Sequence, residues 1–218
     1  MTKREMLARL PIVAIIGSGQ PDHPSDRLAF EIGELVARKH CHLLTGGGDG
    51  VMLDASRGFT AVRARRGLAI GVIPRTPEGE PKPGYPNEHI EVPIFTHLAG
   101  ADPTSVHSRN PINVLTSCCV VALPGNVGTR AEARLARRYR TPIRAVIDTT
   151  ETPDSARFEE EMRAMGVASV RVEIRHDAAD GYDLGALETF IDGVPVTASG
   201  DLTPSDAPLT IGEHAVHS

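Results

Sequence analysis

The stretch Val120-Val121-Ala122-Leu123-Pro124-Gly125-Asn126-Val127-Gly128-Thr129-Arg130-Ala131-Glu132 decides the fold that we expect for this 218-residue chain. It lies within an apolar run, residues 118–123, of the kind that a buried parallel strand shows. A Pro-Gly-Asn turn follows. Residues 127–138 then place Val127, Ala131 and Leu135 on one face of a helix. A strand, a turn and a helix in this order predict one unit of a parallel α/β sheet.

The start of this predicted helix has the properties of an anion-binding site. The first backbone N–H groups of a helix have no partner within it, and the helix dipole favours negative charge there. Gly125 and Gly128 leave room for a ligand to approach the backbone, and Thr129 adds a hydroxyl group. Glu132 places a carboxylate one turn further on. This carboxylate is either a functional group or simply a favourable partner of the dipole, worth about 0.3–1 kcal/mol.

The same alternation of strands and helices continues along the chain. Apolar runs predict parallel strands at residues 11–16, 41–45, 68–73, 92–95, 118–123, 143–147 and 167–174. Helical spacing predicts helices at residues 26–39, 51–66, 111–117, 127–138, 153–165 and 184–191, and Asp102-Pro103 could start a further helical turn. Ser25 is the expected cap of the first helix and Asn110 that of the third.

These elements predict an α/β fold, a Rossmann-like doubly wound parallel sheet in a single domain over residues 1–192, with helices on both faces. Residues 75–91, which are rich in proline and glutamate, predict a long surface loop. Residues 193–218 predict an extended or partly disordered tail, because Pro, Thr, Ser, Gly and Asp dominate there.

Three glycine turns follow predicted strands. They are Gly17-Ser18-Gly19, Gly46-Gly47-Gly48-Asp49-Gly50 and Pro124-Gly125-Asn126-Val127-Gly128. The carboxyl ends of parallel strands share one edge of the sheet, and ligands of such folds bind there, where the strand order reverses. Together the three turns predict a nucleotide or phosphosugar site.

Other ligand and cofactor classes are disfavoured. The turn at Gly17 lacks the third glycine of the dinucleotide fingerprint, and the second strand ends without an acidic residue, which argues against NAD. The P-loop pattern is absent because no Gly-Lys-Ser/Thr sequence occurs. The nine histidines show no ligand spacing, so we expect no metal. The predicted chemistry requires no cofactor.

The overall composition is that of an ordinary soluble domain. Hydrophobic residues make up 40% of the chain and the net charge is −5, whereas a nucleic-acid-binding domain would be basic. Arginines cluster near the carboxyl ends of two predicted helices, where cations suit the dipole. No apolar stretch of about eighteen residues, no signal-peptide pattern and no C-x-x-C motif occur. We therefore expect a cytoplasmic protein that binds neither nucleic acid nor membranes.

Three segments, taken in order, carry a resemblance to a known family. The segment from Thr45 to Met52 resembles a T-G-G-G-x-G-V-M turn, Ser108-Arg109-Asn110 an arginine segment, and the segment from Pro124 to Glu132 a P-G-G-x-G-T-x-x-E motif. These motifs are typical of the LONELY GUY family and its close relatives, the molybdenum cofactor carrier proteins. The resemblance spans about residues 11–148. It implies a Rossmann-like homodimer and, as in the hydrolase members, cleavage of a nucleoside 5′-monophosphate into free base and ribose 5-phosphate.

The resemblance also implies roles for single residues. Arg109 and Glu132 map to the residues that carry the hydrolase activity, in which an arginine can hold the phosphate and a carboxylate can act at the ribose. The alternative for Arg109 is a structural ion pair on a loop. The predicted ligand-binding residues are the glycine turns and their polar neighbours: Gly17, Ser18, Gly46, Gly47, Gly48, Asn110, Gly125, Asn126, Gly128 and Thr129.

Three departures from the family pattern leave two functions open. Asn126 replaces a glycine, and we expect it to preserve the turn through the left-handed conformation that Asn tolerates. Asn110 stands where the cytokinin-activating members carry lysine, and Asn113 with the Ser117-Cys118-Cys119-Val120 context is more like the carrier branch. The sequence thus predicts either a nucleoside 5′-monophosphate phosphoribohydrolase or a non-catalytic carrier of an AMP-like nucleotide or of molybdenum cofactor.

Overall fold

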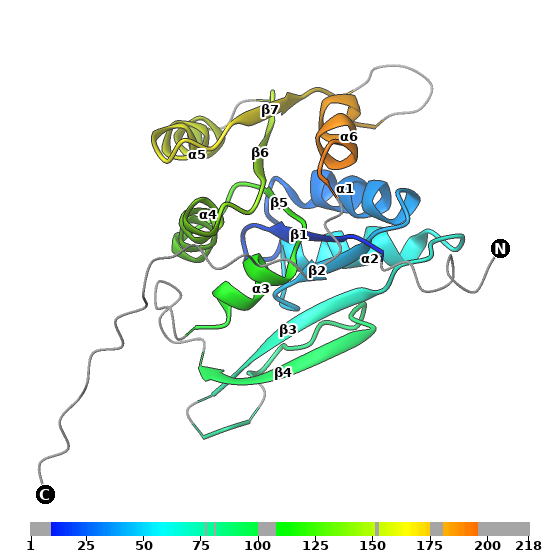
Figure 1. The fold of residues 1–218 in the computed structure, drawn as a ribbon, viewed down its shortest axis with the longest axis vertical. Helices are drawn as coiled ribbons and strands as arrows, with labels where there is room; N and C mark the ends of the chain where they lie inside the picture. The colour runs from blue at the N-terminus through cyan, green and yellow to red at the C-terminus, as the bar shows by residue number, and fades with distance from the viewer. Residues whose placement is uncertain are drawn as a thin grey trace, which may run out of the picture.

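A computed structural model describes the chain at residues 10–76, 78–80, 82–99, 108–150, 153–174 and 181–195. Seven strands form one sheet, with helices on both of its faces (Figure 1). The strands are β1 (Ile12–Ile16), β2 (His42–Thr45), β3 (Ala69–Arg75), β4 (Val92–Ala99), β5 (Cys119–Ala122), β6 (Ile143–Asp148) and β7 (Ser169–Val172). The helices are α1 (Asp26–Arg38), α2 (Val51–Ala61), α3 (Asn110–Thr116), α4 (Val127–Tyr139), α5 (Pro153–Ala164) and α6 (Gly185–Asp192).

The order of the strands places the reversal point at the centre of the sheet. The order is β4-β3-β2-β1-β5-β6-β7, and all neighbouring strands pair in parallel. The chain builds outward from β1 to β4, crosses to the other side of β1, and builds outward again from β5. The doubly wound, Rossmann-like sheet predicted from the sequence is therefore confirmed. The edge at which sheets of this kind bind ligands lies beyond the carboxyl ends of β1 and β5.

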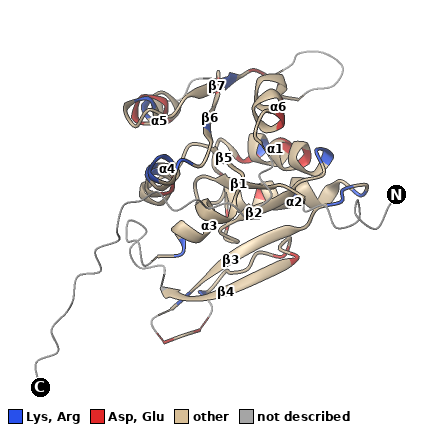
Figure 2. Cartoon of the chain, in the orientation of Figure 1, with Lys and Arg blue, Asp and Glu red and all other residues tan. Residues whose placement is uncertain are grey.

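Alternate residues of the strands enter two separate apolar cores. Val13 and Ile15 of β1 pack with α1, α2 and α6 on one face. Ala14 and Ile16 pack with α3, α4 and α5 on the other. Charged side chains lie mainly on the helices, and the central strands carry few (Figure 2). Because both faces of the central strands are covered, β1 and β5 contain only apolar residues, which is the pattern that predicts them.

Helices α1 and α2 cross with their backbones in contact, because each carries a glycine at the crossing. A Cβ atom on Gly33 would overlap the carbonyl oxygen of Ala55. A Cβ atom on Gly58 would overlap the carbonyl oxygen of Phe30 and lie 2.7 Å from its carbonyl carbon. This close packing fixes the position of α2, whose first residue contacts the ligand-binding edge.

The strands on one side of the sheet extend further than the apolar runs predict. β3 continues through Pro74 to Arg75, and its register against β4 is irregular between Ile73 and Arg75. A proline has no N–H to donate to a neighbouring strand, so prolines within sheets occur at irregularities of this kind. β4 continues to Ala99, because pairing with the extended β3 carries it past the predicted end at Phe95.

Helix α2 is shorter than predicted, ending at Ala61 instead of at about Arg66. Val62 has an extended conformation, and the Arg65 guanidinium donates hydrogen bonds at 3.2 Å to the carbonyl oxygens of Thr60 and Val62. In α4, by contrast, Arg137 and Arg138 lie in the last helical turn, as predicted. Arg65 thus caps the carboxyl end of α2 with its side chain, although the residue itself lies beyond the helix.

Two predicted helix starts differ in detail. α3 begins at Asn110 with Arg109 as its cap residue, one residue earlier than expected, because Pro111 can occupy the first turn without an N–H. Ser25 is the cap residue of α1, but its side chain makes no cap bond. Asp26 instead accepts a hydrogen bond from the backbone N–H of His23 at 2.7 Å.

Some predictions fall on parts of the chain that the structure does not describe. These are the helical turn expected from Asp102-Pro103 and the tail from residue 196 onward. Within the described ranges, no helix is both long and apolar enough to cross a membrane.

Candidate functional site

A cavity of about 480 Å³ lies at the carboxyl edge of the sheet, over the ends of the central strands. Its size falls in the range of about 300–1,000 Å³ that is usual for small-molecule sites. Eight of the predicted site residues line it: Gly17, Gly46, Arg109, Asn110, Asn126, Gly128, Thr129 and Glu132. The other predicted residues lie in the same glycine turns, next to the lining residues: Ser18, Gly47, Gly48 and Gly125.

The three glycine turns contact one another around the end of β1. The backbone N–H of Ser18 donates to the carbonyl oxygen of Pro124 at 3.1 Å, and its carbonyl oxygen accepts from the N–H of Val51 at 3.0 Å. A Cβ atom on Gly125 would overlap Thr129 Oγ1 and lie 2.9 Å from backbone atoms of Gly17 and Ser18. Glycine is therefore required at position 125 for the first and third turns to meet.

The start of α4 presents an unsatisfied hydroxyl group at the cavity wall. Thr129 is only 1% exposed, and its Oγ1 has no hydrogen-bond partner among the residues that the structure describes. A buried hydroxyl without a partner costs about 1–3 kcal/mol and is rare in folded proteins. A ligand oxygen bound at the helix start would satisfy this hydroxyl together with the dipole of α4.

Asn126 preserves the turn by a different means from the one predicted. Its backbone is extended, with φ −105° and ψ −155°, so the expected left-handed conformation is wrong. The Asn126 side chain instead caps α4, since its Oδ1 accepts a hydrogen bond from the N–H of Gly128 at 3.2 Å. An extended residue does not need to be glycine, which is why asparagine fits at this position.

The second glycine turn holds the loop that connects β3 to β4. The carbonyl oxygen of Gly47 accepts from the backbone N–H of Asn87 at 2.8 Å, and that of Gly48 accepts from Asn87 Nδ2 at 2.7 Å. A Cβ atom on Gly48 would lie 2.5 Å from the Tyr85 ring. Both glycines therefore have a structural role, and their direct contact with a ligand stays a prediction.

Arg109 is bonded to the backbone of two strand ends. Its Nη1 donates to the carbonyl oxygen of Val72 at 2.6 Å and to that of Gly46. Its guanidinium carbon lies 5.5 Å from the centroid of the Tyr85 ring. Within the described part of the chain, Arg109 forms no ion pair, so its structural role rests on carbonyl groups and not on an acid. Its predicted role in holding a phosphate stays a prediction.

Glu132 lies at the cavity wall and is 8% exposed. Its Oε1 accepts a hydrogen bond from Asn113 Nδ2 at 2.7 Å. Burial raises the pKa of the Glu132 carboxyl, and the bond from Asn113 and the charge of Arg109 only partly oppose this rise. The sequence indicates Asn113 only as a residue that resembles the carrier branch of the family, and not as a partner of Glu132. Asn113 lies four residues after Arg109, which is the signal that the two residues share one face of α3.

We expect Glu132→Gln to stabilise the protein at pH 7.5 but not at pH 4.5. Burial raises the folded-state pKa of Glu132 above the ordinary value of 4.5, so the folded state holds the proton more tightly than the unfolded chain. The wild-type free energy of unfolding therefore falls as the pH rises above about 4.5 towards the folded-state pKa. Gln keeps an oxygen for Asn113 and has no charge to desolvate.

Thermal unfolding of both proteins at the two pH values measures this effect. The variant should melt at a higher temperature than wild type at pH 7.5, where about 2–4 °C corresponds to about 1 kcal/mol in a chain of this size. At pH 4.5 the two melting temperatures should agree. An equal or lower melting temperature of Glu132→Gln at pH 7.5 would contradict a carboxyl group destabilised by burial.

Comparison with known proteins agrees with the resemblance seen in the motifs. The molybdenum cofactor binding protein of the phototrophic bacterium Rippkaea orientalis is 30% identical, with 75% of this chain and 90% of that chain covered and a TM-score of 0.56. The molybdenum cofactor carrier protein of Chlamydomonas reinhardtii is 26% identical, with 84% and 99% covered and a TM-score of 0.59.

A sequence relative and a family profile complete the comparison. An uncharacterized protein of Archaeoglobus fulgidus is 30% identical over 128 residues, which are 59% of this chain and 74% of that protein. The profile of the SLOG cluster4 family matches residues 10–174, which is most of the chain. On the glycine turns, the sheet order and this match, the chain belongs to the SLOG cluster4 family.

Proposed function

We propose that the protein binds a phosphorylated heterocycle at the carboxyl edge of its sheet and serves as a non-catalytic carrier of molybdenum cofactor or of a related nucleotide. The observation that carries the proposal is the buried, unpartnered hydroxyl of Thr129 at the start of α4. A phosphate oxygen bound there accepts from this hydroxyl and gains from the helix dipole. The similarity to the molybdenum cofactor binding protein of Rippkaea orientalis and to the molybdenum cofactor carrier protein of Chlamydomonas reinhardtii supports the choice of ligand.

The hydrogen bonds of Arg109 favour a carrier over a hydrolase, and the raised pKa of Glu132 sets a condition on hydrolysis. Cleavage of an N-glycosidic bond develops positive charge on the ribose, which an ionised carboxylate must stabilise or attack. Burial favours the neutral form of the Glu132 carboxyl in the ligand-free protein. Two backbone carbonyls also occupy Nη1 of Arg109, which leaves fewer of its donors for a phosphate.

A nucleoside 5′-monophosphate phosphoribohydrolase is the second candidate, and Glu132 itself is the observation that favours it. It is the single carboxylate among the described residues that line the cavity. A buried carboxyl with a raised pKa is also what a general acid or base near neutral pH requires. In this case Glu132 acts at the ribose while the glycine turns hold the phosphate.

The two functions separate in one assay for released base. We expect wild-type protein, incubated with adenosine, guanosine and cytidine monophosphates, to release no base above the protein-free rate, although it binds at least one of them. Glu132→Gln should then bind with equal or higher affinity, because it removes a potential negative charge beside the phosphate. Calorimetric titration measures the binding.

The opposite outcomes identify the hydrolase. Base release by the wild type that falls at least about a hundredfold in Glu132→Gln would replace the carrier by the phosphoribohydrolase. Equal, nonzero release by the two proteins would mean hydrolysis by a group other than Glu132. Failure of the wild type to bind any of the three nucleotides would remove the proposed nucleotide site.

We also propose that the protein is a homodimer that associates through α3 and α4. These neighbouring helices expose large apolar side chains, since Leu115 is 59% and Val127 is 55% exposed. A second copy would cover them as a two-fold interface does. Sedimentation at micromolar concentration should show a dimer, which Leu115→Glu should shift towards the monomer; a wild type that is purely monomeric would contradict the proposal.

A further inference from the structure

The loop between β3 and β4 forms a wall of the cavity opposite the start of α4. This loop is fixed at several points along its length. The backbone N–H of Lys82 donates to the carbonyl oxygen of Pro74 at 3.3 Å, and Asn87 bonds to the carbonyl oxygens of Gly47 and Gly48. Two of its side chains, Lys82 and Tyr85, line the cavity. The loop is thus attached to the site and contributes to its surface.

Tyr85 positions the ammonium group of Lys82. The ring lies against Gly48, where a Cβ atom would be 2.5 Å away. The guanidinium carbon of Arg109 lies 5.5 Å from the ring centroid, and Lys82 Nζ lies 5.3 Å from it. Cations at such distances are attracted to the negative face of an aromatic ring. The ring therefore restrains Lys82 although the lysine itself is exposed.

The ammonium group of Lys82 is free to donate to a ligand, whereas part of the Arg109 guanidinium is bonded to the backbone. Arg109 donates to two backbone carbonyls. Lys82 forms no ion pair and no side-chain hydrogen bond with any part of the chain that the structure describes. The loop thus places a cation at the cavity wall, and its three donors have no side-chain or carbonyl acceptor among the residues that the structure describes.

The phosphate position and Lys82 lie at different ends of the cavity. The phosphate position is formed by the turns after β1 and β5, whereas Lys82 is anchored to β3, and β2 and β1 lie between β3 and β5 (Figure 1). Three strand spacings correspond to roughly 14 Å. A phosphate group alone does not span this separation. A ligand that has its phosphate at α4 and extends along this edge towards β3 presents its heterocycle to Lys82.

We propose that Lys82, held by Tyr85, makes the site selective for a phosphorylated heterocycle with a ring carbonyl group, such as a 6-oxo purine nucleotide. An ammonium group donates hydrogen bonds and accepts none. It pairs with the O6 and N7 acceptors of guanine and meets an N–H₂ donor at the same position of adenine. This inference rests on the proposed binding of a phosphorylated heterocycle and adds the feature of the ring that is recognised.

Calorimetric titration with guanosine, inosine and adenosine 5′-monophosphates tests the inference in the full-length protein. Wild type should bind the guanosine and inosine nucleotides at least about tenfold more tightly than the adenosine nucleotide. Lys82→Met removes the donors and keeps the length of the side chain. It should abolish this preference by weakening the two oxo nucleotides, and should leave the affinity for adenosine monophosphate within about twofold.

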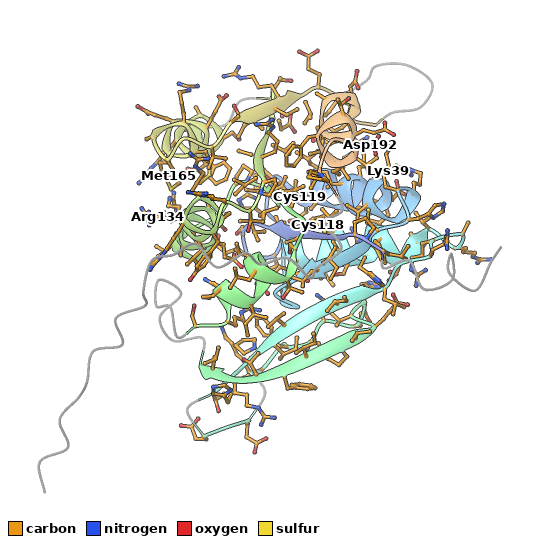
Figure 3. All side chains as sticks on the ribbon, in the orientation of Figure 1. Lys39, Cys118, Cys119, Arg134, Met165 and Asp192 are labelled. Carbon is orange, nitrogen blue, oxygen red and sulfur yellow. The ribbon has the colours of Figure 1, made fainter. Side chains whose placement is uncertain are left out.

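Lys39→Met is the matched control, because it removes the same charge at a site outside the cavity. Lys39 follows α1 at the amino edge of the sheet and pairs with two carboxylates of α6, Glu188 at 2.6 Å and Asp192 at 2.7 Å (Figure 3). The Lys39→Met variant should retain the full preference for the two oxo nucleotides. Tyr85→Ala, which leaves Lys82 in place without its aromatic support, should reduce the preference, whereas Tyr85→Phe, which keeps the ring, should retain it.

Three results would overturn the inference, and each is distinct from failure of the proposed function. Equal wild-type affinity for the three nucleotides would remove the selectivity. Equal weakening of all three in Lys82→Met would place the lysine at the phosphate instead. An unchanged preference in Lys82→Met would assign the selectivity to another residue. Absence of binding by all three nucleotides would refute the proposed nucleotide site itself, and the inference with it.

Discussion

Replacing Gly125 with Ala is expected to weaken the binding of a phosphorylated ligand at least about a hundredfold. The new methyl group would overlap Thr129 Oγ1 and lie 2.9 Å from backbone atoms of Gly17 and Ser18. The first and third turns would have to separate by a substantial part of an ångström, which also moves the start of α4. Displacement of positioning groups by about 1 Å is enough for a hundredfold loss.

Titration of the variant with guanosine 5′-monophosphate measures this effect, with thermal unfolding as the check that the sheet is intact. Gly185→Ala is the control, because a Cβ atom at the start of α6 would have only an ordinary 3.4 Å contact with Asp183. Its affinity should equal that of wild type. An affinity of Gly125→Ala within about twofold of wild type would show that contact between the two turns does not shape the binding site.

Gly58→Ala is expected to lower the free energy of unfolding by about 1–3 kcal/mol, the usual cost of overpacking a close contact. A Cβ atom there would overlap the carbonyl oxygen of Phe30, a backbone atom that cannot rotate away. Alanine is ordinarily the better helix former by about 0.5–1 kcal/mol, so a loss of stability would isolate the cost of separating α1 from α2.

Thermal unfolding measures the loss, which should lower the melting temperature by about 2–4 °C for each kcal/mol. Gly185→Ala again serves as the control and should melt at or slightly above the wild-type temperature, since its surroundings are open. A melting temperature of Gly58→Ala equal to that of the control would mean that the two helices can move apart without loss of packing.

The sheet could be predicted from the sequence because its strands are buried on both faces. Runs such as Val120 to Leu123 contain only apolar residues, and three of the predicted strands are followed by a glycine turn. The exception is β4, at the edge of the sheet. It was predicted only as far as Phe95, because its pairing with β3 depends on an irregular register that no local pattern encodes.

The positions of the candidate site residues were predicted better than their contacts. Thr129 and Glu132 line the cavity, as their places after a predicted strand imply, and Arg109, which is assigned from the family resemblance, lines the same cavity. The bonds of Arg109 to the carbonyl groups of Gly46 and Val72 were not predicted, since they join segments that are distant in sequence. Such contacts depend on the order of the strands and not on any motif.

Tyr85 and Lys82 were missed because the loop that carries them has no periodic pattern. Its prolines and glutamates predict a surface loop, and they do so correctly. The available signal was an aromatic residue and a lysine close together in a long loop at the ligand-binding edge, where loops often carry function. That signal becomes specific only once the turn at Gly48 is seen to hold the Tyr85 ring.

The central claim is that the turns after β1 and β5 bind a phosphate group, and titration of wild type with guanosine 5′-monophosphate and with guanosine tests it most directly. The two ligands share the base and the ribose, so they differ only in the group assigned to the start of α4. We predict that the nucleotide binds at least about a hundredfold more tightly than the nucleoside, since charge-assisted bonds at a helix start are lost without the phosphate. Equal affinities for the two ligands would contradict the claim.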